Sequence, residues 1–239
     1  MNIGVFDSGA GGKLVAEKIQ EALPSANVIL KADPEYFPYG NKSPEIILKR
    51  IALFTREFQK LGCAIVVIAC NTATTNSISD LRKEFPDIQF VGVEPPVKPI
   101  VEMTKTGRVA VIGTEATIRS ERLARLIKQF SKNVKIDAIA CPGLAEFIET
   151  FVQPQQQSLR ATERSLAISD DSEKQLLKEF LDKPISEGVD VVGIACTHYP
   201  YLLSEMKELY PNVTFYDPAD AVVRRVIMKA NDSMGTISN

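Results

Sequence analysis

Two segments of the chain repeat one pattern of residues. Residues 66–72 read VVIACNT and residues 191–198 read VVGIACTH. Each is a short run rich in Val and Ile, typical of a buried strand, that stops at a cysteine and then turns polar. His198, two positions past the second cysteine, is the only histidine in 239 residues. Two thiols in matching local settings indicate one site with two equivalent chemical faces.

Composition and charge exclude several classes of protein. With 45% hydrophobic residues the chain can build one large domain or two ordinary ones. The 28 basic and 30 acidic residues give a formal charge of −2, so we expect neither a nucleic-acid nor a membrane partner, since both favour concentrated positive charge. The sequence shows neither a signal peptide nor an apolar run of the roughly 18 to 20 residues that a membrane span needs. We therefore expect a cytoplasmic protein with four reduced cysteines.

Short Val/Ile-rich runs alternate with amphipathic segments along the chain. This pattern is typical of an α/β fold, in which helices cover both faces of a parallel sheet. A helix is expected at residues 44–60, where Ser43 can cap the first turn and Pro44 suits the first helical position. The polar residues 153–175 indicate a surface connection with some helix and no chemistry. Strands are expected at residues 2–6, 26–30, 64–69, 88–92, 108–113, 134–140, 189–195 and 212–216.

A proline-rich stretch marks a boundary between two domains. Residues 94–99 read EPPVKP, and closely spaced prolines interrupt both strand ladders and helices. The opening strand and turn, residues 3–9, has a loose counterpart in residues 109–114, just as the two cysteine segments correspond. We therefore predict two similar doubly wound α/β domains with mainly parallel sheets. Their expected bounds are residues 1–96 plus about 205–239 for the first domain, and about 97–204 for the second.

Polar and reactive side chains follow four of the predicted strands, where parallel α/β sheets bind their ligands. A thiol needs neighbours that favour the thiolate if it is to act as a base. Asp7 near one thiol and His198 near the other can accept or relay a proton. Hydroxyls and amides in the same loops can hold the carboxylates and ammonium of a small zwitterion. These are Ser8, Asn71, Thr72, Thr114, Thr117 and Thr197.

Each of these features also has a purely structural interpretation. Buried cysteines often only pack, as we expect for Cys63 and Cys141, and the two strand-end cysteines can be core residues as well. Residues 7–9, Asp-Ser-Gly, also suit a tight turn and a helix cap, and Tyr39 also suits a packing role. The glycines at 9–12 lack the ending of a phosphate loop and the dinucleotide spacing. Without a paired Cys-x-x-Cys motif, we predict no metal site.

Five motifs together resemble a known family, the cofactor-independent glutamate racemases within the aspartate/glutamate racemase group. They stand in the family's order and span most of the chain: Phe6–Gly12, Pro38–Ser43, Ala69–Ala73, Gly113–Thr117 and Ala195–Pro200. The resemblance implies a two-domain α/β enzyme with its active site in the interdomain cleft. It implies that L- and D-glutamate are interconverted by a two-base mechanism that uses no pyridoxal phosphate or other cofactor. It also implies a role in peptidoglycan biosynthesis.

The same resemblance implies roles for individual residues. Cys70 and Cys196 would be the two bases, supported by Asp7 and His198. Glu149 matches a further acidic residue of the family through a looser motif. The expected contacts to glutamate are Ser8, Tyr39, Gly40, Asn71, Thr72, Thr114, Thr117 and Thr197.

Three questions stay open from the sequence. The substrate can be aspartate or another small acidic amino acid, although aspartate-specific members commonly carry an acidic residue where His198 stands, which favours glutamate. The chain can instead be a catalytically silent intracellular relative that only binds a ligand. Both a monomer and a homodimer fit the sequence.

Overall fold

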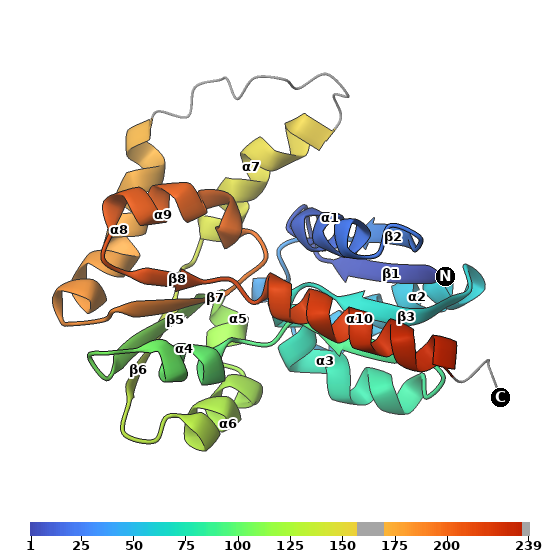
Figure 1. The fold of residues 1–239 in the computed structure, drawn as a ribbon. Helices are drawn as coiled ribbons and strands as arrows, with labels where there is room; N and C mark the ends of the chain where they lie inside the picture. Colours follow the sequence, from blue (N-terminus) through green and yellow to red (C-terminus); the bar gives the residue numbers. More distant parts are fainter. Residues whose placement is uncertain (157–169, 236–239) are drawn as a thin grey trace. The chain divides into compact units, whose positions relative to one another are not determined.

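The computed structural model describes residues 1–156 and 170–235, and these form two compact units (Figure 1). The first unit comprises Met1–Glu94 and Pro218–Asn239, and the second comprises Pro95–Asp217. Each unit contains one four-stranded sheet in which every pair of neighbouring strands is parallel.

The first sheet has the strand order β2-β1-β3-β4. Its strands are β1 (Asn2–Asp7), β2 (Asn27–Ala32), β3 (Cys63–Ile68) and β4 (Gln89–Gly92). The helices of this unit are α1 (Gly12–Ala22), the short 3-10 helix η1 (Tyr39–Asn41), α2 (Pro44–Lys60), α3 (Asn71–Glu84) and α10 (Ala219–Gly235).

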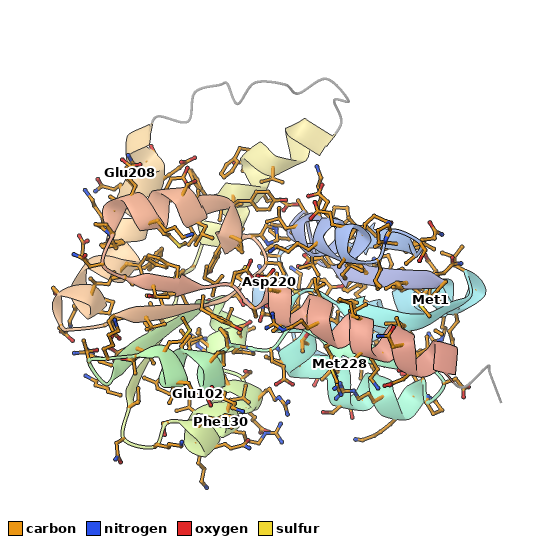
Figure 2. All side chains as sticks on the ribbon, viewed as in Figure 1. Met1, Glu102, Phe130, Glu208, Asp220 and Met228 are labelled. Carbon is orange, nitrogen blue, oxygen red and sulfur yellow. The ribbon has the colours of Figure 1, made fainter. Side chains whose placement is uncertain are left out.

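Side chains along β1 and β3 point alternately to the two faces of the sheet, so the core of the first unit has two layers. Ile3 and Ile65 pack with apolar residues of α1 and α10, such as Val226. Phe6 and the residues of β3 that point the other way pack with α2 and α3, for example against Phe58. Because successive side chains of a strand point to opposite faces, each face of the sheet is covered by its own pair of helices. Met228 of α10, labelled in Figure 2, is 55% exposed and points away from this core.

Helix α2 spans the predicted residues. The Ser43 hydroxyl accepts a hydrogen bond from the Ile46 N–H at 3.4 Å, and Pro44 occupies the first helical position. After the helix, Gly62 has a φ of +70°, a conformation that side chains other than glycine rarely adopt. The chain then enters β3 directly.

The second sheet has the strand order β6-β5-β7-β8, which is the topology of the first sheet repeated. Its strands are β5 (Arg108–Gly113), β6 (Lys135–Ala140), β7 (Val191–Ala195) and β8 (Thr214–Tyr216). The helices of this unit are α4 (Val97–Met103), α5 (Glu115–Ile118), α6 (Glu121–Phe130), α7 (Leu144–Gln156), α8 (Asp170–Ser186), the 3-10 helix η2 (Tyr199–Leu202) and α9 (Leu203–Leu209).

Helices again cover the second sheet on both sides. Ile100 of α4 and Leu123 of α6 pack against β5 and β7, through residues such as Val109. Helices α7, α8 and α9 lie on the other side of this sheet (Figure 1). Lys174 of α8 pairs with Glu208 of α9 at 2.8 Å, near the label of Glu208 in Figure 2.

The predicted fold class is confirmed, and all eight predicted strands are present with no boundary displaced by more than two residues. The chain returns to the first unit after Asp217, whereas the sequence placed this return at about residue 205. The difference arises because β8 pairs with β7, which holds residues up to 217 in the second unit. Of the polar stretch 153–175, the structure shows helix at both ends, and residues 157–169 lie outside the described residues. No helix in the described part of the chain is both long and apolar enough to cross a membrane.

Candidate active site

Cys70 lies beside the end of β1 because β1 and β3 are neighbours in the first sheet. We call the residues that follow these two strands the Cys70 cluster: Asp7, Ser8, Cys70, Asn71 and Thr72. The Ser8 hydroxyl lies 3.4 Å from the Cys70 sulfur. One carboxylate oxygen of Asp7 accepts a hydrogen bond from the Gly9 N–H at 2.9 Å. All five residues of the cluster are buried, so the structure gathers the predicted residues of both strand ends in one sheltered place.

The thiol of Cys70 occupies the N-cap position of α3, a helix of 14 residues. Its sulfur accepts from the Ala73 N–H at 3.5 Å. The first N–H groups of a helix have no partner within the helix, and the helix dipole adds partial positive charge at this end. This position therefore favours a negatively charged sulfur at Cys70.

Asn71 and Thr72 form the first turn of α3 and are 3% and 2% exposed. Their carbonyls already accept side-chain hydrogen bonds, from Thr75 at 3.0 Å and from Asn76 at 2.8 Å. The Asn71 side-chain oxygen, by contrast, is buried with no hydrogen-bond partner among the described residues. Leaving such an atom unpaired costs about 1–3 kcal/mol. A donor group of a ligand beside Cys70 would remove this cost.

Gly12 allows α1 to approach the Cys70 cluster closely. A Cβ at this position would lie 2.5 Å from the Asp7 Cβ, which is closer than two carbon atoms can pack. The glycines that follow β1 therefore let the helix begin directly against the Asp7 side chain.

Tyr39 and Gly40 belong to η1, which contacts α3. The Tyr39 hydroxyl donates to a carboxylate oxygen of Asp33 at 2.7 Å, and its ring lies 6.1 Å from the Phe6 ring. Burial and then the hydrogen bond to Asp33 raise the pKa of the Tyr39 phenol far above its ordinary value. Tyr39 thus keeps its proton, directed at Asp33. The sequence interpretation missed Asp33, because the strand was predicted at residues 26–30, whereas β2 extends to Ala32 and Asp33 follows it directly.

Cys196 lies beside the end of β5, because β5 and β7 are neighbours in the second sheet. We call the residues gathered here the Cys196 cluster: Thr114, Thr117, Glu149, Cys196, Thr197 and His198. The Cys196 sulfur lies 3.9 Å from His198 Nδ1, and His198 Nε2 lies 2.6 Å from a carboxylate oxygen of Glu149. His198 and Glu149 are 2% and 6% exposed. The structure therefore brings Glu149, on α7, into direct contact with the lone histidine.

The contact with Glu149 determines how His198 faces the thiol. A ring nitrogen that faces a carboxylate at this distance carries a proton, because a carboxylate only accepts hydrogen bonds. In the neutral imidazole the other nitrogen, Nδ1, then carries no proton and faces Cys196. His198 can accept a proton from this thiol and return it, and Glu149 stabilises the charged ring.

Two threonines of the Cys196 cluster are joined to each other. Thr114 is the N-cap of the short helix α5, and its hydroxyl accepts from the Thr117 N–H at 3.3 Å. The same hydroxyl donates to the Thr117 hydroxyl at 3.1 Å. Thr197 follows Cys196 and is 8% exposed. The hydroxyls predicted for this unit thus stand at the ends of the strands that position Cys196.

The two remaining cysteines occupy different places. Cys63 begins β3, at the opposite end of the strand from Cys70, and is 4% exposed. Cys141 is 2% exposed, and its carbonyl accepts from the Tyr199 hydroxyl at 3.2 Å. Burial and then the charge of nearby Cys196 raise the pKa of the Cys141 thiol to about 12. Cys141 therefore remains a neutral thiol at physiological pH, beside the Cys196 cluster.

The site residues present no obvious place for a metal ion. In residues 1–156 and 170–235, no three His, Cys, Asp or Glu side chains are grouped so that they could share a metal ion. In the Cys196 cluster, the imidazole of His198 contacts the Cys196 sulfur on one side and the Glu149 carboxylate on the other.

Comparison with known proteins gives a consistent result. The family model of the Asp/Glu/Hydantoin racemases matches residues 10–226. A glutamate racemase of Pseudomonas syringae pv. tomato is 37% identical over 227 residues, which cover 94% of this chain and 76% of that protein. A glutamate racemase of Ectopseudomonas mendocina is 35% identical over 225 residues, covering 94% of this chain and 80% of that protein.

Solved structures agree with the sequence relatives. The chain is similar to the crystal structure of Escherichia coli glutamate racemase in complex with L-glutamate and the activator UDP-MurNAc-Ala, with a TM-score of 0.81 and 31% identity. That match covers 95% of this chain and 81% of the other. A glutamate racemase isoform of Bacillus anthracis matches with a TM-score of 0.80 and 28% identity, over 97% of this chain and 82% of that one. The chain therefore belongs to the Asp/Glu/Hydantoin racemase family.

Proposed function

We propose that this protein interconverts L- and D-glutamate by two-base proton transfer at Cα, with Cys70 and Cys196 as the two bases. The observation that carries the proposal is the equivalent placement of the two thiols, each within two residues of the end of the corresponding strand in two sheets of one topology. In the curated relatives the activity is that of a glutamate racemase.

The proposed reaction needs no oxidant or cofactor. The thiolate of one cysteine removes the proton from Cα, and the electron pair left behind is delocalised into the adjacent carboxylate. The thiol of the other cysteine then donates its proton to the opposite face of Cα, which inverts the centre. Each turnover leaves the two sulfurs with exchanged protonation states. The mechanism therefore requires both thiols to reach the same Cα, from opposite sides.

The surroundings of each thiol support its part in this reaction. The N-terminus of α3 favours a thiolate at Cys70, and Asp7 is the acidic group of its cluster. His198, backed by Glu149, can exchange a proton with Cys196.

Polar groups beside both thiols suit the recognition of an amino acid. The unpartnered Asn71 oxygen is an acceptor for an ammonium group. The hydroxyls of the two clusters can donate hydrogen bonds to the carboxylates of the substrate; they belong to Ser8, Thr72, Thr114, Thr117 and Thr197. The helix η1 adds backbone groups of Tyr39 and Gly40. We propose that D-glutamate made in this way serves peptidoglycan biosynthesis in the cytoplasm.

Proton exchange in heavy water tests the reaction. L-Glutamate incubated with the protein alone should gain deuterium at Cα, measured by mass spectrometry, while its optical rotation decays to zero. Cys70→Ala and Cys196→Ala should each abolish racemisation, because each removes one of the two proton carriers. Cys63→Ala is the matched control, since it deletes a buried cysteine at the far end of β3 and should retain activity. Full racemisation by either of the first two variants would exclude the two-thiol mechanism.

A panel of enantiomers tests the substrate. Glutamate, aspartate and other small acidic amino acids should be compared by kcat/KM, the quantity that measures discrimination between substrates. The proposal expects glutamate to be preferred. Preference for another acidic amino acid would keep the mechanism and change the substrate, and binding without exchange of the Cα hydrogen would make the chain a ligand-binding relative.

A further inference from the structure

Asp33, directly after β2, joins three segments of the first unit. Its carboxylate accepts the Tyr39 hydroxyl at 2.7 Å and two hydrogen bonds from Arg50, from Nε at 2.8 Å and from Nη2 at 2.7 Å. Its backbone N–H donates to the carbonyl of Asp7 at 3.2 Å. The end of β1, the helix η1 and the helix α2 are therefore all bound to one residue, which is 1% exposed: β1 through the backbone of Asp33, and the two helices through its carboxylate.

Arg50 is held as firmly as its partner. The guanidinium carbon lies 3.9 Å from the centre of the Tyr36 ring, and its side chain is 19% exposed. A second carboxylate, on the exposed Glu35, lies 3.5 Å from Nη2. A guanidinium that forms two parallel bonds to one carboxylate and stacks on a ring has a fixed orientation, which a lysine cannot reproduce.

A buried pair of this kind is weak evidence for a purely stabilising role. Removing a carboxylate and a guanidinium from water is costly, and well-packed apolar residues often stabilise a core at least as well. The pair stands next to candidate site residues, because Asp33 is tied to Asp7 by the backbone and to Tyr39 by the side chain. Tyr39 shares a buried cluster with Phe6 and Cys70.

We propose that Asp33 and Arg50 are positioning residues, which fix the Tyr39-Gly40 segment and the end of β1 around Cys70. This inference rests on the proposed function for its effect on glutamate. Its effect on Cys70 itself does not depend on any substrate.

The test compares Asp33→Asn, Arg50→Lys and a control. Asp33→Asn keeps the shape of the side chain but replaces the carboxylate, which orients Arg50 and accepts the hydrogen bond from Tyr39, with a neutral amide. Arg50→Lys keeps the cation and loses the two-point contact. Asp137→Asn is the control, because Asp137 accepts from Arg108 Nε at 2.8 Å in the second unit, in a carboxylate–arginine pair whose carboxylate is more exposed than that of Asp33.

The first readout is the rate at which iodoacetamide alkylates each cysteine of the substrate-free protein, mapped by mass spectrometry. Asp33→Asn should accelerate alkylation of Cys70 by about tenfold, because a loosened η1 opens more often. Cys196 serves as the internal reference and should change by less than about twofold, since local opening leaves the other unit closed. The alkylation rate of Cys70 in Arg50→Lys should lie between the rates in wild type and in Asp33→Asn. Asp137→Asn should leave the alkylation rate of Cys70 unchanged.

The second readout is steady-state racemisation. Asp33→Asn should raise KM for both glutamate enantiomers by about tenfold with a smaller change in kcat, as expected when a binding segment is misplaced. An unchanged Cys70 alkylation rate in Asp33→Asn, or equal increases at Cys70 and Cys196, would overturn the positioning role. If wild-type protein does not racemise glutamate, the proposed function fails, and the alkylation rates alone still decide this inference.

Discussion

The two cysteine clusters share a backbone arrangement and differ in the chemistry around the thiol. Cys70 and Cys196 each follow the strand that neighbours the first strand of their unit. Cys70 caps a 14-residue helix and contacts a hydroxyl, whereas Cys196 is followed by the four-residue η2 and contacts an imidazole. The first thiol thus faces backbone N–H groups that would favour a charged sulfur, whereas the second faces side chains that would suit the proposed proton exchange. A repeated fold can therefore supply two equivalent positions without supplying two identical environments.

A second pair of equivalent positions shows the same contrast. The Asp33 N–H donates to the last residue of β1, and the Cys141 N–H donates to Gly113, the last residue of β5, at 2.9 Å. Each of the two residues also accepts a hydrogen bond from a buried tyrosine hydroxyl, at the Asp33 carboxylate and at the Cys141 carbonyl. The first unit thus places a charged group where the second places a neutral thiol. The residues behind each catalytic candidate differ as much as the residues beside it.

Among the groups around the two thiols, the largest effect is expected when the proposed proton-exchange partner of a thiol is removed. His198→Asn and Asp7→Asn should each lower kcat/KM by about 10²–10⁴-fold, the usual contribution of a general acid or base. Because two enantiomers have equal free energies, kcat/KM must fall by the same factor in both directions. Circular dichroism assays started from L- and from D-glutamate measure this.

If the two variants lose different amounts of kcat/KM, the comparison between the clusters becomes sharper. If kcat/KM falls by less than about tenfold in Asp7→Asn but by the expected factor of about 10²–10⁴ in His198→Asn, the helix N-terminus alone supports the charge on Cys70. A normal rate in His198→Asn would break the assignment of the histidine to Cys196.

A smaller effect is expected from glycines that allow close packing beside the two clusters. Gly12→Ala places a Cβ 2.5 Å from the Asp7 Cβ, and such overpacking should cost about 1–3 kcal/mol of unfolding free energy. Gly113 occupies the position equivalent to Asp7, and there the nearest atom to an added Cβ is the Ala195 carbonyl oxygen, at 3.1 Å. Gly113→Ala should therefore cost less than Gly12→Ala in urea unfolding. The reverse order would mean that the second unit is packed more tightly at its strand ends than the first.

The smallest effect concerns the ends of the strands that lie away from the thiols. In the second unit Asp190 accepts from the Thr104 hydroxyl and from the Lys105 and Thr106 N–H groups, at 2.5, 2.7 and 3.1 Å. Burial opposes ionisation of Asp190, but these hydrogen bonds outweigh it and hold its pKa below the ordinary value. In the first unit the corresponding link is a neutral amide, with Asn2 Nδ2 donating to the Leu61 carbonyl at 2.6 Å.

This difference predicts that acid weakens the link in the second unit alone. A depressed carboxyl pKa contributes stability above the unfolded value of about 3.9, and that stability is lost as pH falls through the folded pKa. Asp190→Asn should lower the unfolding free energy by about 1 kcal/mol at pH 7, with a smaller difference from wild type at pH 3. Asn2→Ala should show the same loss at both pH values. A pH-independent loss in Asp190→Asn would contradict the assignment, and urea titrations measure all three proteins.

The sequence carried enough information to place the strands and the candidate residues. The Val/Ile-rich runs predicted the strands, because a strand that is buried on both faces is apolar along its whole length and ends where polar residues begin. The same strand ends identified Cys70 and Cys196, because parallel strands bring their carboxyl ends to one edge. The pattern said less about where the chain returns to the first unit, because pairing of β8 with β7 is a long-range contact.

Side-chain partners were the part that local pattern could not supply. Arg50 fits the spacing of a helix face, and nothing in its neighbourhood shows that it reaches Asp33, 17 residues earlier. The contact between Glu149 and His198 joins residues 49 positions apart, and the loose motif around Glu149 pointed to that residue but not to its partner. Such pairs depend on how helices pack over the sheet, which periodicity within one segment does not report.

The first unit is assembled from both ends of the chain, since α10 supplies Val222, Val226 and Ala230 to the face formed by Ile3, Val5 and their neighbours. During synthesis on the ribosome, the second unit emerges complete while this face of the first unit is covered by α1 alone and still lacks α10. A nascent chain that stalls before residue 219 would therefore expose the apolar side of β1 and β3 to chaperones, proteases and aggregation.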